Sequence, residues 1–276
     1  MGISLTKMSD RNLKFSYTEA INELVKASQD ENLVVFMGAG VSKYVNPNYP
    51  VWDGVTAKLR KSLRFCFSKN ALVIAQKYEN KYGFIKLKDA VENLFPTISP
   101  DTSFYTELLK VHPTFLITTN WDNMLQSAIE SEMYMYDTIA DDKELMSSKL
   151  ANKYLKIHGD FKHENFVLTK KSYKRYSKDF PLMENFVKSI LCTNTVLFLG
   201  YSLSDIDFQQ ILEWIKRTAP VAPSFYCAVD ENFYREQDTI KYAKYGIKTF
   251  TVSNFVKIFE ELNDVNITIK NNFGII

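Results

Sequence analysis

Seven short apolar runs separated by helical segments constrain the fold of this chain more than any other feature of its sequence. Several of the runs are continuous rather than alternating, which is typical of parallel strands covered by helices on both faces. The sequence therefore predicts an α/β fold with a Rossmann-like, doubly wound parallel sheet at its core. The predicted strands comprise residues 33–37, 114–118, 154–157, 165–168, 195–199, 225–229 and 248–252.

A helical pattern replaces the strand pattern between the first two runs, beginning with Val55, Leu59 and Leu63 on one face. We predict a helical insertion here that covers a ligand site. With 276 residues, of which 46% are hydrophobic, the chain has enough material for one sizeable core. The predicted boundaries are 17–45 and 111–265 for the Rossmann-like core, 54–110 for the insertion and 1–276 for the single domain.

Local signals refine the connections between these elements. The sequence SYTE at 16–19 predicts a capping box for the first helix. Pro47 and Pro50 predict that residues 44–55 are largely irregular. The polar segment 141–152 lacks a ligand pattern and is expected to be a solvated connection.

The first apolar run leads directly into a glycine turn that contains Gly38, Ala39, Gly40 and Ser42. Glycines let the backbone turn tightly and come close to a ligand, and amides at a helix start bind the phosphates of a pyrophosphate. The same turn is also useful in any α/β fold without a ligand, and the third glycine of a GxGxxG fingerprint is missing.

Other special residues follow three further predicted strands. Asn120 and Asp122 come after the second run, His158 after the third, and Gly200 and Ser202 after the run at 195–199. In a doubly wound sheet, ligands bind beyond the carboxyl ends of the strands. We therefore expect these residues and the glycine turn to line one crevice.

Four motifs stand in the same order as in a known family: GAGVS at 38–42, TTNWD at 118–122, IHGD at 157–160 and FLGYSLSD at 198–205. The chain resembles the sirtuin (SIR2-like) family over roughly residues 30–230, which implies NAD as its substrate. Deacylating sirtuins usually carry a zinc ribbon built from two C-x-x-C pairs. This chain has no C-x-x-C, so we expect no metal; it looks like the prokaryotic SIR2-like domains of antiphage defence.

The resemblance implies roles for the residues of the predicted crevice. Asn120 would position the ribose or a water, since an amide both donates and accepts hydrogen bonds. His158 would be the general base, because an imidazole takes up a proton near neutral pH. Asp122 would face the nicotinamide carboxamide, although an N-cap of helix 122–130 explains it too. Gly38, Ala39, Gly40, Ser42, Gly200 and Ser202 would bind the rest of the NAD molecule.

The function implied by this resemblance is NAD+ hydrolysis to nicotinamide and ADP-ribose, which would deplete NAD in antiphage (abortive infection) defence. Two alternatives stay open: an NAD-dependent protein deacylase or ADP-ribosyltransferase, and a noncatalytic sensor of NAD or ADP-ribose. Domains of this kind commonly assemble as oligomers and are joined to sensor regions. We therefore expect a homo-oligomer and a fused or separate, phage-triggered sensor or activator.

The composition also bears on nucleic-acid partners, on membrane spans and on the cellular compartment. Acidic and basic residues nearly balance, with a net charge of +2, so no nucleic-acid partner is expected. The bases and tyrosines at 170–178 are expected to form a solvated helix face. No apolar stretch approaches the roughly 20 residues of a membrane span. Three widely separated cysteines, Cys66, Cys192 and Cys227, fit a reducing cytoplasm.

The remaining candidates have a structural interpretation beside a functional one. Trp52 is expected to anchor the next helix in the core, with a ligand contact as the alternative. His112 and His163 lack a motif and are expected on the surface or in turns. Asp205 and Asp207 are expected to cap a helix rather than to catalyse a reaction. The 20 Phe and 16 Tyr residues predict an aromatic core more than an association surface.

Overall fold

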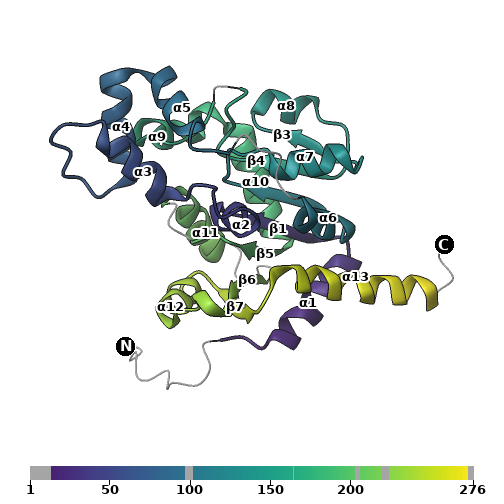
Figure 1. Ribbon diagram of the computed structural model, residues 1–276. Helices are drawn as coiled ribbons and strands as arrows, with labels where there is room; N and C mark the ends of the chain where they lie inside the picture. The colour runs from purple at the N-terminus through teal and green to yellow at the C-terminus, as the bar shows by residue number, and fades with distance from the viewer. Residues whose placement is uncertain (1–13, 97–101, 164, 203–205, 219–223, 273–276) are drawn as a thin grey trace.

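The computed structural model describes residues 14–96, 102–163, 165–202, 206–218 and 224–272, and it is built around a seven-stranded sheet (Figure 1). The strand order is β3-β4-β2-β1-β5-β6-β7, and every neighbouring pair is parallel. This confirms the predicted Rossmann-like α/β fold. The strands are β1 (Leu33–Met37), β2 (Phe115–Thr118), β3 (Asp137–Ile139), β4 (Lys153–Lys156), β5 (Thr195–Leu199), β6 (Phe225–Asp230) and β7 (Ile247–Val252).

Helices cover both faces of the sheet, as continuous apolar strands require. One face packs on α1 (Tyr17–Gln29), α6 (Ser103–Lys110), α7 (Met124–Ser131) and α13 (Phe255–Asn272). The other packs on α10 (Pro181–Thr193), α11 (Ile206–Thr218) and α12 (Glu236–Ala243). All five residues of β1 are buried, because this strand lies at the centre of both cores.

A third core lies outside the sheet, in the predicted helical region. It is formed by α3 (Trp52–Lys61), α4 (Ala71–Tyr82) and α5 (Phe84–Glu92), which lie together at the upper left of Figure 1 beside α9 (Lys170–Asp179). Val55 and Leu59 are buried there as the pattern predicted. The helix α6, by contrast, packs in the core against the sheet.

Six of the seven predicted strands are confirmed, and the one predicted at residues 165–168 is wrong. Residues 165–168 form no strand, and their one backbone bond to the β4 region runs from the Val167 amide to the His158 carbonyl, at 2.9 Å. Phe166 and Leu168 are apolar because they fill the third core. The three-residue edge strand β3 was missed.

Three local predictions also need correction. The helix α1 begins as expected, but the Ser16 side chain makes no capping bond, and the chain enters the helix from a backbone bond between Phe15 and Thr249. The segment 141–152 is not merely a solvated connection, because α8 (Asp142–Ser147) forms there. The irregular segment is shorter than the predicted 44–55, because α2 (Ala39–Val45) ends only at Val45 and α3 already begins at Trp52.

Most of the aromatic residues do form core. The rings of Phe36, Phe198, Tyr201 and Phe208 pack against one another with centroid distances of 4.5–6.2 Å, beneath the carboxyl ends of β1 and β5. Within the described part of the chain, all three cysteines are free thiols. No helix in that part is both long and apolar enough to cross a membrane.

Candidate functional site

The site forms where the strand order reverses in the parallel sheet, between the neighbouring strands β1 and β5. Gly38 has an extended backbone and Gly40 lies within α2, so neither has a conformation that only glycine adopts. A Cβ atom on either would nevertheless lie 2.6–2.7 Å from the Gly200 carbonyl oxygen. The Gly40 amide donates to that oxygen at 2.9 Å. These glycines therefore let two backbone turns touch, and the Gly40 amide is already engaged.

A cleft of about 530 Å³ opens beside this contact, within the size range of small-molecule sites. A smaller side pocket of about 30 Å³ adjoins it. Ala39, Val51, Trp52 and Thr119 line both cavities. Of the predicted site residues, Gly40, His158, Gly200 and Ser202 line only the cleft, Ser42, Asn120 and Asp122 line only the side pocket, and Gly38 lines neither.

The Asn120 amide is held in one orientation by two hydrogen bonds. Its Nδ2 donates to the Gly38 carbonyl at 3.0 Å and to Ser42 Oγ at 2.9 Å. A carbonyl only accepts, so the NH2 end must face Gly38. Both N–H groups are thus used within the protein, and the capacity left to Asn120 is acceptance by Oδ1, not the combined donation and acceptance that we expected from the sequence.

Ser42 links Asn120 to Asp122. The Ser42 hydroxyl is buried, accepts from Asn120 and donates to Asp122 Oδ2 at 2.7 Å. The other carboxylate oxygen accepts from the Met124 amide at 3.2 Å, near the start of α7. Burial raises the pKa of Asp122 above its ordinary value, although the bonds from Ser42 and Met124 and the charge of Lys156 oppose the shift. Asp122 thus serves the helix start and also faces the side pocket.

His158 lies two residues beyond β4 and is almost fully buried. Its ring packs edge-on against Tyr173 of α9, with centroids 5.3 Å apart. Both residues line the cleft and also a second cavity of about 580 Å³ bounded by α9, α10 and α11. The imidazole therefore stands between two cavities. Tyr173 was missed, although Tyr173 and Tyr176 share one face of a helix in the sequence.

Lys156 is the other residue that the sequence analysis missed. It is fully buried at the end of β4, and its Nζ donates to the Asp122 carbonyl at 2.9 Å. The signal was a lysine inside the apolar run YLKI, in alternation with Tyr154 and His158. Lysine is rarely buried without a charged partner, so Asp160 in the same motif was a candidate for that partner.

The other candidates lie as follows. Trp52 packs on Trp121 at a centroid distance of 5.6 Å, as expected of an anchor for α3, and it also lines the cleft, so a ligand contact stays a prediction. His112 packs on Tyr134 after α6, away from the site. His163 lies in a turn, as expected, but its ring bridges two carboxylates. Asp205 and the side chain of Asp207 lie outside the described residues.

The described residues contain no group of three or more His, Cys, Asp or Glu side chains placed to hold a metal ion. The segment 170–178 forms the exposed helix α9, apart from the inward-facing Tyr173. The side chains that line the two cavities include the amide of Asn120, the carboxyl group of Asp122 and the imidazole of His158.

Comparison with known proteins gives one family and several relatives. Residues 114–250 match the family model described as SIR2-like domain. Defense-associated sirtuin 2 of Bacillus subtilis is 27% identical over 250 residues, which cover 86% of this chain and 25% of that protein. The NAD(+) hydrolase ThsA of Bacillus cereus (strain MSX-D12) is 25% identical over an alignment of 276 positions, which covers 91% of this chain and 57% of that protein.

A second NAD(+) hydrolase ThsA, from Cytobacillus dafuensis, is 27% identical over 204 residues, 71% of this chain and 40% of that protein. The chain therefore spans between a quarter and just over half of the length of these curated relatives.

Proposed function

The chain belongs to the SIR2-like family, and from this premise we propose that it is an NAD+ hydrolase, which cleaves the nicotinamide–ribose bond with water. Relatives that cover most of this chain carry the name NAD(+) hydrolase. The observation that carries the proposal is the Asn120 amide, which is fixed by Gly38 and Ser42 with only its Oδ1 left to act. This oxygen is an acceptor for a ribose hydroxyl or for the attacking water.

The two cavities suggest which part of NAD each group of residues would bind. The backbone of the Gly40 and Gly200 turns, together with Ala39 and Ser202, would hold the ADP-ribose part in the 530 Å³ cleft. The nicotinamide would lie where the cleft meets the side pocket, beside Trp52 and Thr119 and on the side toward Asp122. Burial raises the pKa of Asp122, while the hydrogen bonds from Ser42 and Met124 favour the ionised carboxylate, which can accept from the carboxamide N–H.

The reaction exchanges one bond to the ribose C1′ for another. The bond between C1′ and the nicotinamide nitrogen breaks, and nicotinamide leaves with the electron pair as a neutral molecule. The oxygen of a water, oriented by Asn120 Oδ1, bonds to C1′. The proton that this water loses passes to the His158 imidazole and then to solvent. The products are nicotinamide, ADP-ribose and a proton.

The biological setting follows from the same family. We propose that NAD hydrolysis by this chain, in the cytoplasm, depletes NAD in antiphage defence, and that the chain works as a homo-oligomer. We further propose a fused or separate sensor region that responds to phage. The defence name of the Bacillus subtilis relative supports this setting.

The test is the release of nicotinamide and ADP-ribose from NAD by the purified protein without any peptide, measured by chromatography at several protein concentrations. We expect Asn120→Ala and His158→Ala each to reduce release by at least about 100-fold, as is usual for lost general-base or positioning groups. Both variants should still unfold cooperatively, at a lower temperature than the wild type because each loses buried contacts. Matched controls are Asn185→Ala on the exposed side of α10 and His112→Asn, whose residues lie away from the cleft.

Three outcomes separate this proposal from the alternatives. Release that survives in both variants contradicts the assigned site. Release that appears only with an acyl-lysine peptide or a protein acceptor favours the transferase alternative, in which the acceptor reaches His158 from the second cavity. NAD binding without release at any protein concentration favours a noncatalytic sensor.

A further inference from the structure

We propose that Lys156 is a positioning residue, a buried cation that holds the turn carrying Asn120 and Asp122 in its reactive geometry. The inference rests on the proposed function for its catalytic consequence. Its structural part, the hold on the turn, stands independently. Lys156 has no exposed surface and lines neither the cleft nor the side pocket, so it acts through the turn and not on the substrate.

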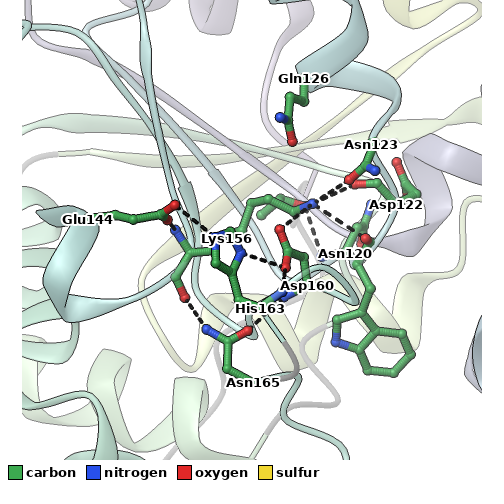
Figure 2. Close-up of polar contacts among 12 residues, drawn as sticks. Asn120, Asp122, Asn123, Gln126, Glu144, Lys156, Asp160, His163 and Asn165 are labelled. Carbon is green, nitrogen blue, oxygen red and sulfur yellow. Dashed lines mark hydrogen bonds and ion pairs between the residues drawn. The ribbon is translucent and has the colours of Figure 1, made fainter. Parts of the chain in front are cut away.

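The contacts of Lys156 Nζ are all with acceptors (Figure 2). It donates to the Asp122 carbonyl and to Asn123 Oδ1, both at 2.9 Å, and lies 3.4 Å from the Trp121 carbonyl. An ammonium has three donors and no acceptor, so this environment suits the charged form. One side chain from β4 thus binds three consecutive residues of the turn between β2 and α7.

Asp160 supplies the counter-charge. Its Oδ2 lies 3.8 Å from Lys156 Nζ, and both side chains are at most 5% exposed. Burial lowers the pKa of Lys156, while the charges of Asp160, Asp122 and Glu144 oppose that shift. Breaking such a buried pair by removing one partner is strongly destabilising, whereas removing both together is much better tolerated.

Asp160 is itself fixed from the far side. Its Oδ1 accepts from the His163 amide at 2.9 Å and lies 2.8 Å from His163 Nδ1. The other ring nitrogen of His163 lies 2.9 Å from Glu144 Oε1 of α8 (Figure 2). Alternating acidic and basic groups therefore run from α8 to Lys156, and the cation has no freedom to leave the turn.

A short chain of hydrogen bonds connects Lys156 to Asn120. Lys156 fixes the main chain at Asp122, whose side chain anchors Ser42, and Ser42 in turn accepts from Asn120. A shift of about 1 Å in a positioned catalytic group costs on the order of 100-fold in rate. Without the cation, three carbonyl-type oxygens would lose their partner, and the turn would rearrange.

The experiment compares the wild-type chain with the double variant Lys156→Met/Asp160→Asn, which removes both buried charges together. The matched control is Lys153→Met, which removes another lysine of β4, whose Nζ donates to the Leu150 carbonyl. Amide hydrogen exchange of residues 118–124, thermal unfolding, and kcat and KM for NAD cleavage are measured for each.

We expect the double variant to unfold cooperatively, to exchange the amides of 118–124 at least tenfold faster, and to lose about 100-fold in kcat with KM changed less than threefold. The control should match the wild type in exchange and kcat. A double variant with wild-type exchange and kcat overturns the inference. If the wild type itself cleaves no NAD, the proposed function fails, and the exchange measurement alone decides the hold on the turn.

A second variant covers the case in which the double variant does not fold. Asn123→Ala removes one of the three acceptors of Lys156 from an exposed residue, with Gln126→Ala on α7 as its control. We expect Asn123→Ala to raise exchange across 118–124 and to lower kcat severalfold, while unfolding stays cooperative and the melting temperature falls by about a few degrees. Equal exchange and kcat in the two variants would contradict the inference.

Discussion

Gly200 leaves no room for a side chain, because backbone atoms of Gly40 and Val41 lie against it. Its φ of +55° is one that L side chains rarely adopt, and a Cβ atom would lie 2.3 Å from the Val41 amide nitrogen. We predict that Gly200→Ala lowers the free energy of unfolding by about 2 to 4 kcal/mol, the left-handed cost plus the overlap. Urea unfolding measures this loss.

Gly246 provides the matched control, since its φ is +78° but a Cβ atom there meets nothing within 4 Å. Gly246→Ala should therefore cost only the backbone term, about 1 to 2 kcal/mol. The difference between the two variants isolates the contact between the turns after β1 and β5. Equal losses would show that the contact does not constrain position 200.

The residues of the site differ in how visible they are in the sequence. Asn120 and His158 could be predicted because each follows an apolar run, and parallel strands bring such positions to one edge. The orientation of the Asn120 amide could not, since its partners, Gly38 and Ser42, lie about 80 residues away. The position of Lys156 in an apolar run was a signal, but its hold on the turn could not be predicted, because two of its four partners are main-chain carbonyls, which leave no mark on the sequence.

Among the elements, α8 has a role that its polar sequence did not indicate. Its first residue, Asp142, accepts from the amides of Leu182 and Met183 at 2.9 Å each. These are orphan donors in the first turn of α10, which begins at Pro181 and has no capping bond from its own N-cap. The carboxylate of one helix thus caps a neighbour 40 residues away and complements its dipole.

We predict that Asp142→Ala lowers the free energy of unfolding by about 1 to 2 kcal/mol, the usual loss for an N-cap. Asp89→Ala on the exposed face of α5 is the control, and it should change stability by less than about 0.5 kcal/mol. Chemical denaturation followed by circular dichroism compares the two. If Asp142→Ala costs no more than Asp89→Ala, the carboxylate does not cap α10.

The errors at the level of elements share one cause, which is tertiary packing. Residues 165–168 have a strand-like apolar composition, yet Phe166 and Leu168 face the third core and not a sheet. The edge strand β3 is only three residues long, and one of its residues, Asp137, is polar because it binds the amides of Lys149 and Leu150. Neither feature can be inferred from local periodicity.

At the scale of the whole molecule, acid adds positive charge to a chain that starts near balance. With 34 lysines and arginines and 32 carboxylate residues, protonation of the carboxylates leaves a strongly cationic protein that repels itself. This background acts on every variant alike. The stability difference between the wild type and a single-site variant therefore isolates the linkage of one carboxyl group to pH.

Asp160 and Asp122 should contribute to acid stability with opposite signs. Burial opposes ionisation of Asp160, but the His163 amide, Lys156 and the His163 side chain lower its pKa below the ordinary 3.8. Its contribution is therefore present above that value and is lost as the pH falls through the lower pKa of the folded state. Burial raises the pKa of Asp122, so its contribution is present below 3.8 and is lost as the pH rises through the higher folded value.

We predict that Asp160→Asn costs about 3 kcal/mol at pH 6, because it leaves Lys156 without its counter-charge, and that this cost shrinks as the pH falls below about 4. For Asp122→Asn, the cost should instead grow as the pH falls from 6 to 3. Urea unfolding at pH 3, 4, 5 and 6 gives both differences. Since general acid unfolding acts on both variants in the same direction, only site-specific linkage produces differences of opposite slope, and parallel slopes would contradict the assigned environments of both carboxyl groups.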